Sequence, residues 1–304
     1  MGIENHLPQQ VVLPYDRIFE DGRFVGYWKY VRGTLEGMNG VIKLEYSKHL
    51  VRRGWSAFEI RVDDEVVVID YSDFLLVDTA SAAFKHWLRF HHTPAFVPYP
   101  NLGSFPPWSF LDWADYTRAK ALPSYTASGE SIVYRHSDLN NRLPNLVQRR
   151  TRAMELLQKH CDDPMTIGKL QTGFIAQQMY FRDCLDSLVV VHIPGSHPHI
   201  LDRTVQQMFA LGVCVISPDL WTTCLEHRPQ AGIHYVGIQD DYSDLSVKIQ
   251  WVAEHRDEAV AIGRSAKQFF AKYCTPTAIW SYIHKRVSEP RALPSESSRD
   301  ATTT

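Results

Sequence analysis

The residues best suited to bind a ligand follow a short apolar run, residues 188–191, which is typical of a buried strand. After it come a loop rich in Gly, Pro, Ser and His and then a helix with Arg203 in its first turn. In an open parallel sheet, ligands bind beyond the carboxyl ends of the strands, where a helix N-terminus attracts phosphate. Gly195 allows close backbone approach, and Arg203 supplies a planar pair of donors that suits a diphosphate. The run therefore predicts a diphosphate site.

The same run contains three imidazoles, at His192, His197 and His199. They raise the alternative of a metal site, but they lack a carboxylate partner at helical spacing, and Pro198 interrupts any regular geometry. The adjacent acidic pairs at 63–64 and 240–241 are interpreted as solvated turns. We therefore expect phosphate contact at this loop, with no metal and no cofactor.

A second apolar run, residues 66–69, is followed by carboxylates at the predicted end of its strand. A carboxylate in a cleft can take a proton from a hydroxyl group if partial burial raises its pKa. Asp73 is the candidate base and Asp78 the reserve, whereas Asp70 is interpreted as structural. The alternative for Asp73 is a turn or a helix cap, positions that Asp favours.

The elements that must position these residues follow from hydrophobic spacing. Strands are expected at 59–62, 66–70, 131–134, 188–191, 213–216 and 234–236, and helices at 78–91, 146–160, 202–211 and 243–273. Alternation of strands and helices in the second half predicts a parallel, doubly wound sheet. We place the domain crossing in the small, polar stretch 124–130, which gives domains 1–125 and 126–287, and we interpret 288–304 as a disordered tail.

Composition narrows the class of protein. With 304 residues and 44% hydrophobic content, the chain can bury one large core or two modest ones. A formal charge of −2 provides no overall field for nucleic acid or anionic lipid. Five cysteines without a CxxC pair favour neither a disulfide framework nor a zinc ribbon, and a reducing compartment is the simpler expectation. No stretch approaches the ~20 apolar residues of a membrane span, and the N-terminus lacks a signal-peptide pattern, so we expect a soluble, cytoplasmic protein.

From residue 132 to residue 287 the sequence resembles the C-terminal half of a GT-B glycosyltransferase. The closest likeness is to the protein O-glucosyltransferases and O-xylosyltransferases, a group that includes fungal capsule-associated proteins. The stretches that carry the resemblance are 133–150, 191–218, 232–270 and, in the first half, 66–74. This chain has Arg135–His136 where the family usually has an arginine-glycine pair.

The resemblance implies an α/β fold of the GT-B type, with two Rossmann-like domains whose parallel sheets face a central cleft. Domain 1–125 would bind the acceptor, and domain 126–287 would bind the donor, a UDP-sugar. The residues implied at the donor are Arg135, Ser137, Arg142, Gly195, His197, Arg203, Ser217 and Leu220. The first six would face the diphosphate, and backbone atoms near Leu220 would bind the uracil.

The implied reaction moves a sugar, glucose or xylose, from the UDP-sugar to a hydroxyl of a saccharide or protein. It would be inverting and independent of metal, with Asp73 as the base. A retaining GT-B transferase and a non-catalytic Rossmann-like binding module remain alternatives. A dinucleotide oxidoreductase is disfavoured because no GxGxxG follows a predicted strand.

Overall fold

The computed structural model describes residues 6–15, 25–38, 40–53, 57–70, 83–89, 102–104, 113–136, 144–161, 169–172, 177–194, 199–220, 225 and 227–289. These residues fall into two compact units. The first takes its residues from the ranges Met1–Trp108 and Pro276–Thr304, with Leu225, and the second from Ser109–Thr222 and Glu226–Thr275. The segment 124–130, where we place the domain crossing, lies inside the second unit, which begins at Ser109.

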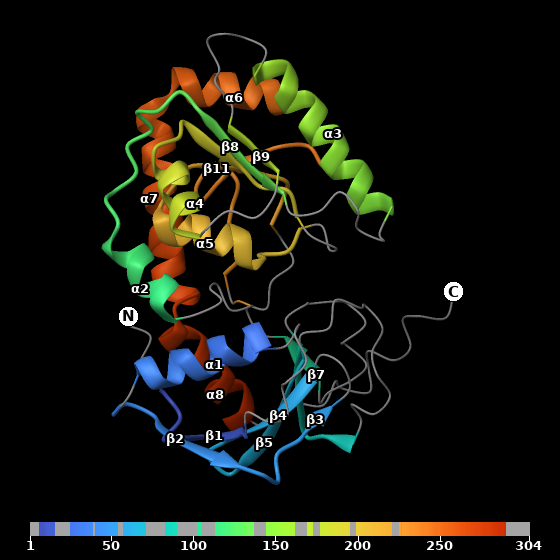
Figure 1. The fold of residues 1–304 in the computed structure, drawn as a ribbon, viewed down its shortest axis with the longest axis vertical. Coiled ribbons are helices and arrows are strands. Elements are labelled where there is room, and N and C mark those ends of the chain that lie inside the picture. The colour runs from blue at the N-terminus through green and yellow to red at the C-terminus, as the bar shows by residue number, and fades with distance from the viewer. Residues whose placement is uncertain are drawn as a thin grey trace, which may run out of the picture. The chain divides into compact units, whose positions relative to one another are not determined.

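The first unit is built on a mixed sheet (Figure 1). Its strands are β1 (Gln10–Pro14), β2 (Lys43–Ser47), β3 (Arg52–Arg53), β4 (Ala57–Val62), β5 (Glu65–Asp70), β6 (His86–Arg89) and β7 (Leu102–Ser104). The order is β2-β1-β4-β5-β6-β7, with β3 also paired to β4. Strands β5, β6 and β7 pair in parallel, as do β1 and β2, whereas β4 is antiparallel to β1, β3 and β5.

A parallel sheet was expected for this unit, and that expectation is wrong for β4. Strands β4 and β5 are joined by the two-residue turn Asp63–Asp64, and so short a connection permits only antiparallel pairing. Asp63 adopts φ 50°, a left-handed conformation that such hairpin turns require. Its Oδ1 also accepts hydrogen bonds from the backbone N–H groups of Gln9 and Gln10 at 2.8 and 2.9 Å. The turn therefore fixes β1 against the hairpin.

The helix expected at 78–91 is also wrong where the structure describes it, because residues 86–89 form β6. The apolar spacing of Phe84, Trp87 and Leu88 suits one face of a helix. Yet all four residues of β6 are buried between β5 and β7, and a strand covered on both faces shows no alternation to distinguish it. The local pattern therefore could not separate the two structures.

Helices α1 (Val25–Gly37) and α8 (Pro276–Ser288) complete the first unit (Figure 1). The indole Nε1 of Trp280 in α8 donates to Thr34 Oγ1 of α1 at 3.2 Å, and both side chains are fully buried. His284 Nε2 lies 3.2 Å from Asp63 Oδ2. The C-terminal helix is thus part of the core of the N-terminal unit, although the domain expected at 126–287 includes it.

The second unit is built on a parallel sheet in the order β12-β11-β10-β8-β9, which confirms the α/β class. Its strands are β8 (Ile132–His136), β9 (Lys169–Thr172), β10 (Val189–Val191), β11 (Val215–Ser217) and β12 (Val236–Gly237). Its helices are α2 (Trp113–Ala121), α3 (Pro144–Cys161), α4 (Gln177–Leu185), α5 (Arg203–Leu211), α6 (Leu245–Glu254) and α7 (Arg256–Tyr273). Every strand expected for this half is found, and so are the helices, with shifts of a few residues at the ends, but the region 243–273 is divided into α6 and α7 at His255.

The strands of this sheet, numbered along the chain, lie in the order 2-1-3-4-5, a doubly wound arrangement. Helix α3 contacts α6, whereas α4 contacts α5, which packs on α7, so the helices form two groups (Figure 1). Right-handed crossovers explain the two groups, because the chain moves outward from β8 to β9 and then reverses to reach β10. The direction in which successive strands are added to the sheet therefore reverses between β8 and β10.

Helix α5 has well-defined ends that match its predicted bounds. Asp202 caps the N-terminus, and Gly212 at φ 76° ends the helix with its N–H bonded to the carbonyls of Met208 and Phe209. Gly212 also lies against α7, where a Cβ on Gly263 would be only 2.2 Å from the Gly212 carbonyl oxygen. This close approach of α5 and α7 fixes the helix that carries Arg203.

Candidate functional site

The carboxyl ends of four strands meet at one edge of the second sheet. Pairing sets Val191 of β10 opposite Tyr134 of β8 and Ile216 of β11, and Ile216 opposite Val236 of β12. The residues that follow these strands therefore leave the sheet at the same level. Because the strand order reverses between β8 and β10, this edge is where an open parallel sheet binds ligands. It is the candidate site.

His192, the first residue after β10, links three elements at this edge. Its Nδ1 lies 2.9 Å from Ser217 Oγ at the end of β11, and its Nε2 lies 3.1 Å from Asp202 Oδ2 at the start of α5. Its carbonyl accepts a hydrogen bond from Tyr242 Oη at 3.4 Å. Asp202 Oδ1 in turn accepts from the Val205 N–H at 3.0 Å. The imidazole thus holds the N-terminus of α5 against the ends of β10 and β11.

The trio Ser217, His192 and Asp202 has the composition of a hydrolase triad, but it is interior. The exposed fraction is 0% for Ser217 and 1% for His192, so no substrate reaches the hydroxyl. Burial alone raises the pKa of Asp202, but His192 and the backbone N–H groups at the start of α5 lower it more. The net effect holds this pKa below its ordinary value, so Asp202 is a carboxylate that pairs with the imidazole. The trio positions the helix.

Arg203 begins α5 directly after the cap residue, and its side chain is half-buried. Within the described ranges no carboxylate pairs with its guanidinium. The positive end of the helix dipole lies beside it and favours an anion, whereas the N–H groups of Thr204 and Val205 are already bonded to the Asp202 carboxylate. The arginine that the sequence singles out therefore lies at a helix N-terminus, and its contact with a phosphate group stays a prediction.

The other residues expected at the donor are only partly covered by the structure. Arg135 lies in β8 with its Cα opposite Gln171 of β9, at the carboxyl end of the strand, and its side chain is not described. The expected site residues that lie outside the described ranges are Ser137, Arg142, Gly195, His197, Asp73 and the reserve Asp78. Their roles stay predictions.

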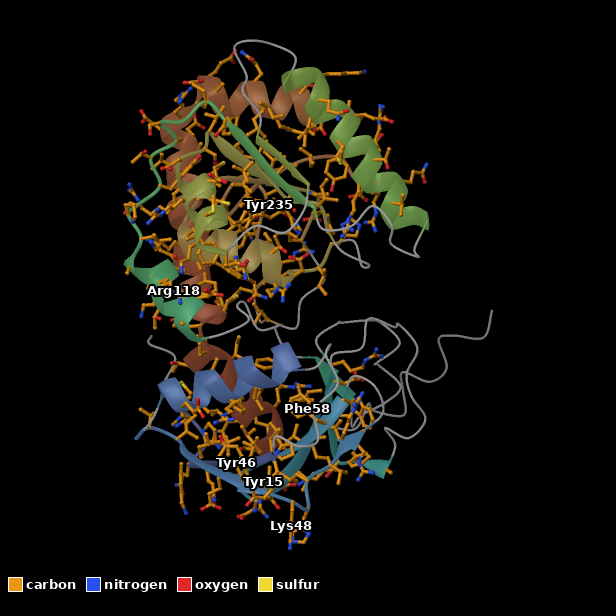
Figure 2. All side chains as sticks on the ribbon, viewed as in Figure 1. Tyr15, Tyr46, Lys48, Phe58, Arg118 and Tyr235 are labelled. Atoms are coloured by element: carbon orange, nitrogen blue, oxygen red, sulfur yellow. The ribbon has the colours of Figure 1, made fainter. Side chains whose placement is uncertain are left out.

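Ser217 and Leu220 follow β11 as expected, but both are interior, with no exposed surface. The Leu220 N–H donates to Tyr235 Oη at 3.1 Å, and Tyr235 Oη donates to Asp219 Oδ1 at 2.6 Å. Tyr235 lies near the middle of the unit (Figure 2), where burial and Asp219 raise its pKa. The Leu220 N–H is therefore already occupied, and Ser217 Oγ is committed to His192.

Two residues at this edge adopt a left-handed backbone conformation that non-glycine residues rarely take. They are His199 at φ 66° and Tyr242 at φ 59°. His199 Nδ1 lies 2.9 Å from the Asp219 carbonyl oxygen, and its Nε2 lies 3.3 Å from Asp240 Oδ2. Each such conformation costs about 1–3 kcal/mol and concentrates at functional sites. The contacts of His199 thus join the loops after β10, β11 and β12. The backbone of His199 and of Tyr242 is strained in this arrangement.

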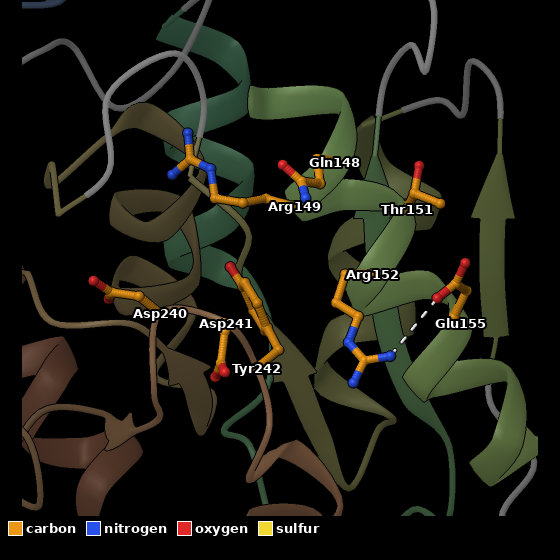
Figure 3. A pocket seen from close by; sticks show the side chains of 8 residues that line it. All are labelled: Gln148, Arg149, Thr151, Arg152, Glu155, Asp240, Asp241 and Tyr242. Carbon is orange, nitrogen blue, oxygen red and sulfur yellow. Dashed lines mark ion pairs between the residues drawn. The ribbon is translucent and has the colours of Figure 1, made fainter. Parts of the chain in front are cut away.

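A pocket of about 690 Å³ opens beside this edge, between α3 and the turn that follows β12 (Figure 3). Its lining residues are Gln148, Arg149, Thr151, Arg152, Glu155, Asp240, Asp241 and Tyr242. Sequence reasoning missed this pocket and assigned Asp240 and Asp241 to a solvated turn. Two signals were present: arginines at i and i+3 on a predicted helix, and an acidic pair four residues after the end of a predicted strand.

Charges of both signs line the pocket. Arg152 lies 3.8 Å from Glu155, one turn further along α3 (Figure 3). Asp241 accepts a hydrogen bond from the Ser243 N–H at 2.9 Å. The hydroxyl and the N–H of Ser243, together with nearby Arg152, lower the pKa of Asp241. The aspartate is therefore charged at neutral pH and presents acceptors to a ligand.

In the first unit, Asp70 ends β5, the strand that leads to the candidate base. Its Oδ2 accepts a hydrogen bond from Trp87 Nε1 at 3.0 Å and lies 3.2 Å from Arg89 Nε. Burial lowers the pKa of Arg89, and Asp70 opposes that effect. Both side chains of the pair are buried, which agrees with the structural role expected for Asp70.

In the described ranges, no group of three or more His, Cys, Asp or Glu side chains is placed to hold a metal ion. In the same part of the chain, no helix is both long and apolar enough to cross a membrane.

Comparison with known proteins bears on the second unit and α8. Residues 210–290 match the family described as Glycosyl transferase family 90. The predicted resemblance is confirmed. The family 90 segment starts within α5 and runs through β11, β12, α6 and α7 to the end of α8, so it contains the acidic turn of the pocket.

Individual relatives agree with this finding. The chain is 33% identical over 78 residues to "O-glucosyltransferase LpsA" of Dichelobacter nodosus, covering 25% of this chain and 24% of that protein. It is 36% identical over 56 residues to "Protein O-glucosyltransferase 2" of Danio rerio, covering 18% and 11%. The matches thus span a quarter or less of these relatives. They support an enzyme of the glycosyltransferase class.

Proposed function

We propose that this protein is a glycosyltransferase that moves glucose or xylose from a UDP-sugar to a hydroxyl of a saccharide or protein. One observation carries the proposal. The reversal of strand order between β8 and β10 lies beside the N-terminus of α5, where Arg203 has no carboxylate partner among the described residues, and the family 90 segment starts at residue 210, near the C-terminal end of that helix. The GT-B arrangement, with an acceptor domain at 1–125 and a donor domain at 126–287, belongs to the same proposal.

The donor would bind along the edge of the second sheet. Arg203 and the positive end of the α5 dipole would face the diphosphate from one side, with Gly195 and His197 before them, and the end of β8 from the other side. The residues proposed after β8 are Arg135, Ser137 and Arg142. Because Leu220 has no exposed surface and its N–H is bonded to Tyr235, any uracil contact would come from backbone atoms near Leu220 and not from Leu220 itself. Ser217 would act through His192.

The transfer would be a single displacement with inversion at the anomeric carbon. The acceptor oxygen attacks C1 of the sugar, its proton passes to Asp73, and the bond from C1 to the phosphate oxygen breaks. The negative charge that develops on UDP would be stabilised by arginines and the helix N-terminus, a role that a metal ion has in other enzymes. We therefore propose a metal-independent enzyme without a cofactor.

The test is a transfer assay with UDP-glucose and UDP-xylose, read by release of UDP and by NMR of the product. Slow release of UDP without acceptor and a product of inverted anomeric configuration support the proposal. Retention of configuration excludes the single displacement. A chain that binds UDP but never releases it from a UDP-sugar is a non-catalytic binding module.

A further inference from the structure

We propose that the pocket between α3 and the turn after β12 binds a neutral ring with neighbouring hydroxyl groups, the ribose or the transferred sugar of the donor. This inference rests on the proposed function, since it assigns the next part of the same ligand. The described residues that line the pocket include none that the sequence assigned to the donor, and its volume of about 690 Å³ lies within the range of roughly 300–1,000 Å³ common for small-molecule sites.

The charge of the lining argues for a neutral ring rather than a phosphate. Among the described lining residues, Arg149 and Arg152 contribute two positive charges, and Glu155, Asp240 and Asp241 contribute three negative charges, so these residues sum to −1. A phosphate group would meet more carboxylate than guanidinium here. A ring with hydroxyl groups instead donates to the carboxylates and accepts from the arginines, so it satisfies both kinds of side chain.

The carboxylates have acceptors left for such a ring. Among the described residues, Asp240 has one partner, His199, which approaches Oδ2 and leaves Oδ1 for a ligand. Among the described residues, the Asp241 carboxylate accepts hydrogen bonds from the Ser243 N–H and hydroxyl and from its own backbone N–H, and it keeps further lone pairs for a ligand. Two neighbouring carboxylates can accept from two neighbouring hydroxyl groups.

The turn that presents these carboxylates is already held in one shape. Its backbone bends at Tyr242, whose side chain is buried and whose Oη donates to the carbonyl of His192. The Gln239 N–H donates to Asp244 Oδ1 at 2.9 Å, and the Tyr242 N–H donates to the Gln239 carbonyl at 2.9 Å. A ligand that binds here therefore spends little free energy on ordering the protein.

The pocket adjoins the proposed diphosphate site. Asp240 contacts His199, which lies three residues before the cap residue Asp202 and four before Arg203. A UDP-sugar carries a ring on each side of its diphosphate, so either ring can extend from α5 into the pocket. Both rings offer the same chemistry, and the experiment must separate them.

The experiment measures affinities by calorimetry for UDP, 2′,3′-dideoxy-UDP and UDP-glucose. The proteins are the wild type, Asp240→Asn, Asp241→Asn and the control Asp257→Asn, an exposed aspartate on α7 outside the pocket. Melting temperatures confirm that each variant is folded. Hydrogen bonds to a charged group are worth about tenfold to a hundredfold in affinity.

If the ribose binds here, wild type prefers UDP over the dideoxy compound by at least tenfold, and the Asp241→Asn or Asp240→Asn variant loses that preference. If the transferred sugar binds here, UDP affinity is unchanged in the variants, but the advantage of UDP-glucose over UDP disappears. Folded variants with wild-type affinity for all three compounds overturn the assignment of the pocket and leave the proposed function standing. A wild type that binds none of the three overturns the proposed function itself.

Discussion

The contribution of the His192–Asp202 pair to stability can be separated from helix capping by two substitutions. Asp202 Oδ1 caps α5 through the Val205 N–H, whereas Oδ2 faces His192 Nε2 at 3.1 Å. Asn is as good a cap as Asp, so Asp202→Asn keeps the first contact and removes only the charge. Asp202→Ala removes both contacts.

The expected magnitudes follow from these two contacts. A hydrogen bond to a charged, largely buried partner is worth about 1.5–3 kcal/mol, and a lost cap costs about 1 kcal/mol. At pH 7 the free energy of unfolding of the second unit should fall by about 2 kcal/mol in Asp202→Asn and by about 3 kcal/mol in Asp202→Ala. Urea unfolding followed by circular dichroism measures both values.

The dependence on pH adds a second check. Because the folded-state pKa of Asp202 lies below its ordinary value of 3.8, the charged form is the one that folding favours. Its contribution is complete above the pKa of the unfolded chain and is lost as the pH falls through the folded-state pKa. The gap between wild type and Asp202→Asn should therefore narrow below about pH 4. A variant as stable as wild type at pH 7, or a gap unchanged at low pH, refutes the role of the pair.

Three further predictions concern packing and chemistry. Gly263→Ala should destabilise the second unit by about 1–3 kcal/mol or more, since its Cβ would lie 2.2 Å from the Gly212 carbonyl oxygen, and urea unfolding should show no such loss for the exposed control Arg264→Ala. Transfer should persist in excess EDTA, and loss of activity that Mn²⁺ restores would contradict the proposed charge stabilisation. Asp73→Asn should lower kcat by about 10²–10⁴-fold with the Kd for UDP unchanged, whereas a near-normal kcat would remove Asp73 as the base.

The sequence was most informative where local signals and tertiary packing agree. Asp202 and Gly212 mark the two ends of α5, because a cap side chain and a left-handed C-terminal residue are local requirements of the backbone. The parallel sheet of the second unit also followed from alternating apolar runs and helical spacing. The placement of Arg203 at the edge of that sheet follows from the start of α5 at Asp202 and from the parallel order of the strands.

The features of the fold and of the site that the sequence did not predict depend on contacts between residues far apart in the chain. Strand β6 was mistaken for a helix because burial on both faces removes the alternation of a strand. Ser217 and Leu220 were placed at the correct strand end, but only the fold shows that Tyr235 and His192 occupy their polar atoms. The pocket joins Arg152 to Asp241, about ninety positions apart, and no local pattern reports such a pairing.

The most direct test of the central claim is the affinity of UDP for Arg203 variants, measured by calorimetry. The claim predicts that Arg203→Ala weakens binding by about 2–3 kcal/mol, the range for a charge-assisted hydrogen bond, and that Arg203→Lys restores only part of it. The matched control is Arg182→Ala, an exposed arginine on α4, which should bind as wild type does. Wild-type affinity for UDP in a folded Arg203→Ala variant would contradict the claim that the N-terminus of α5 binds the diphosphate.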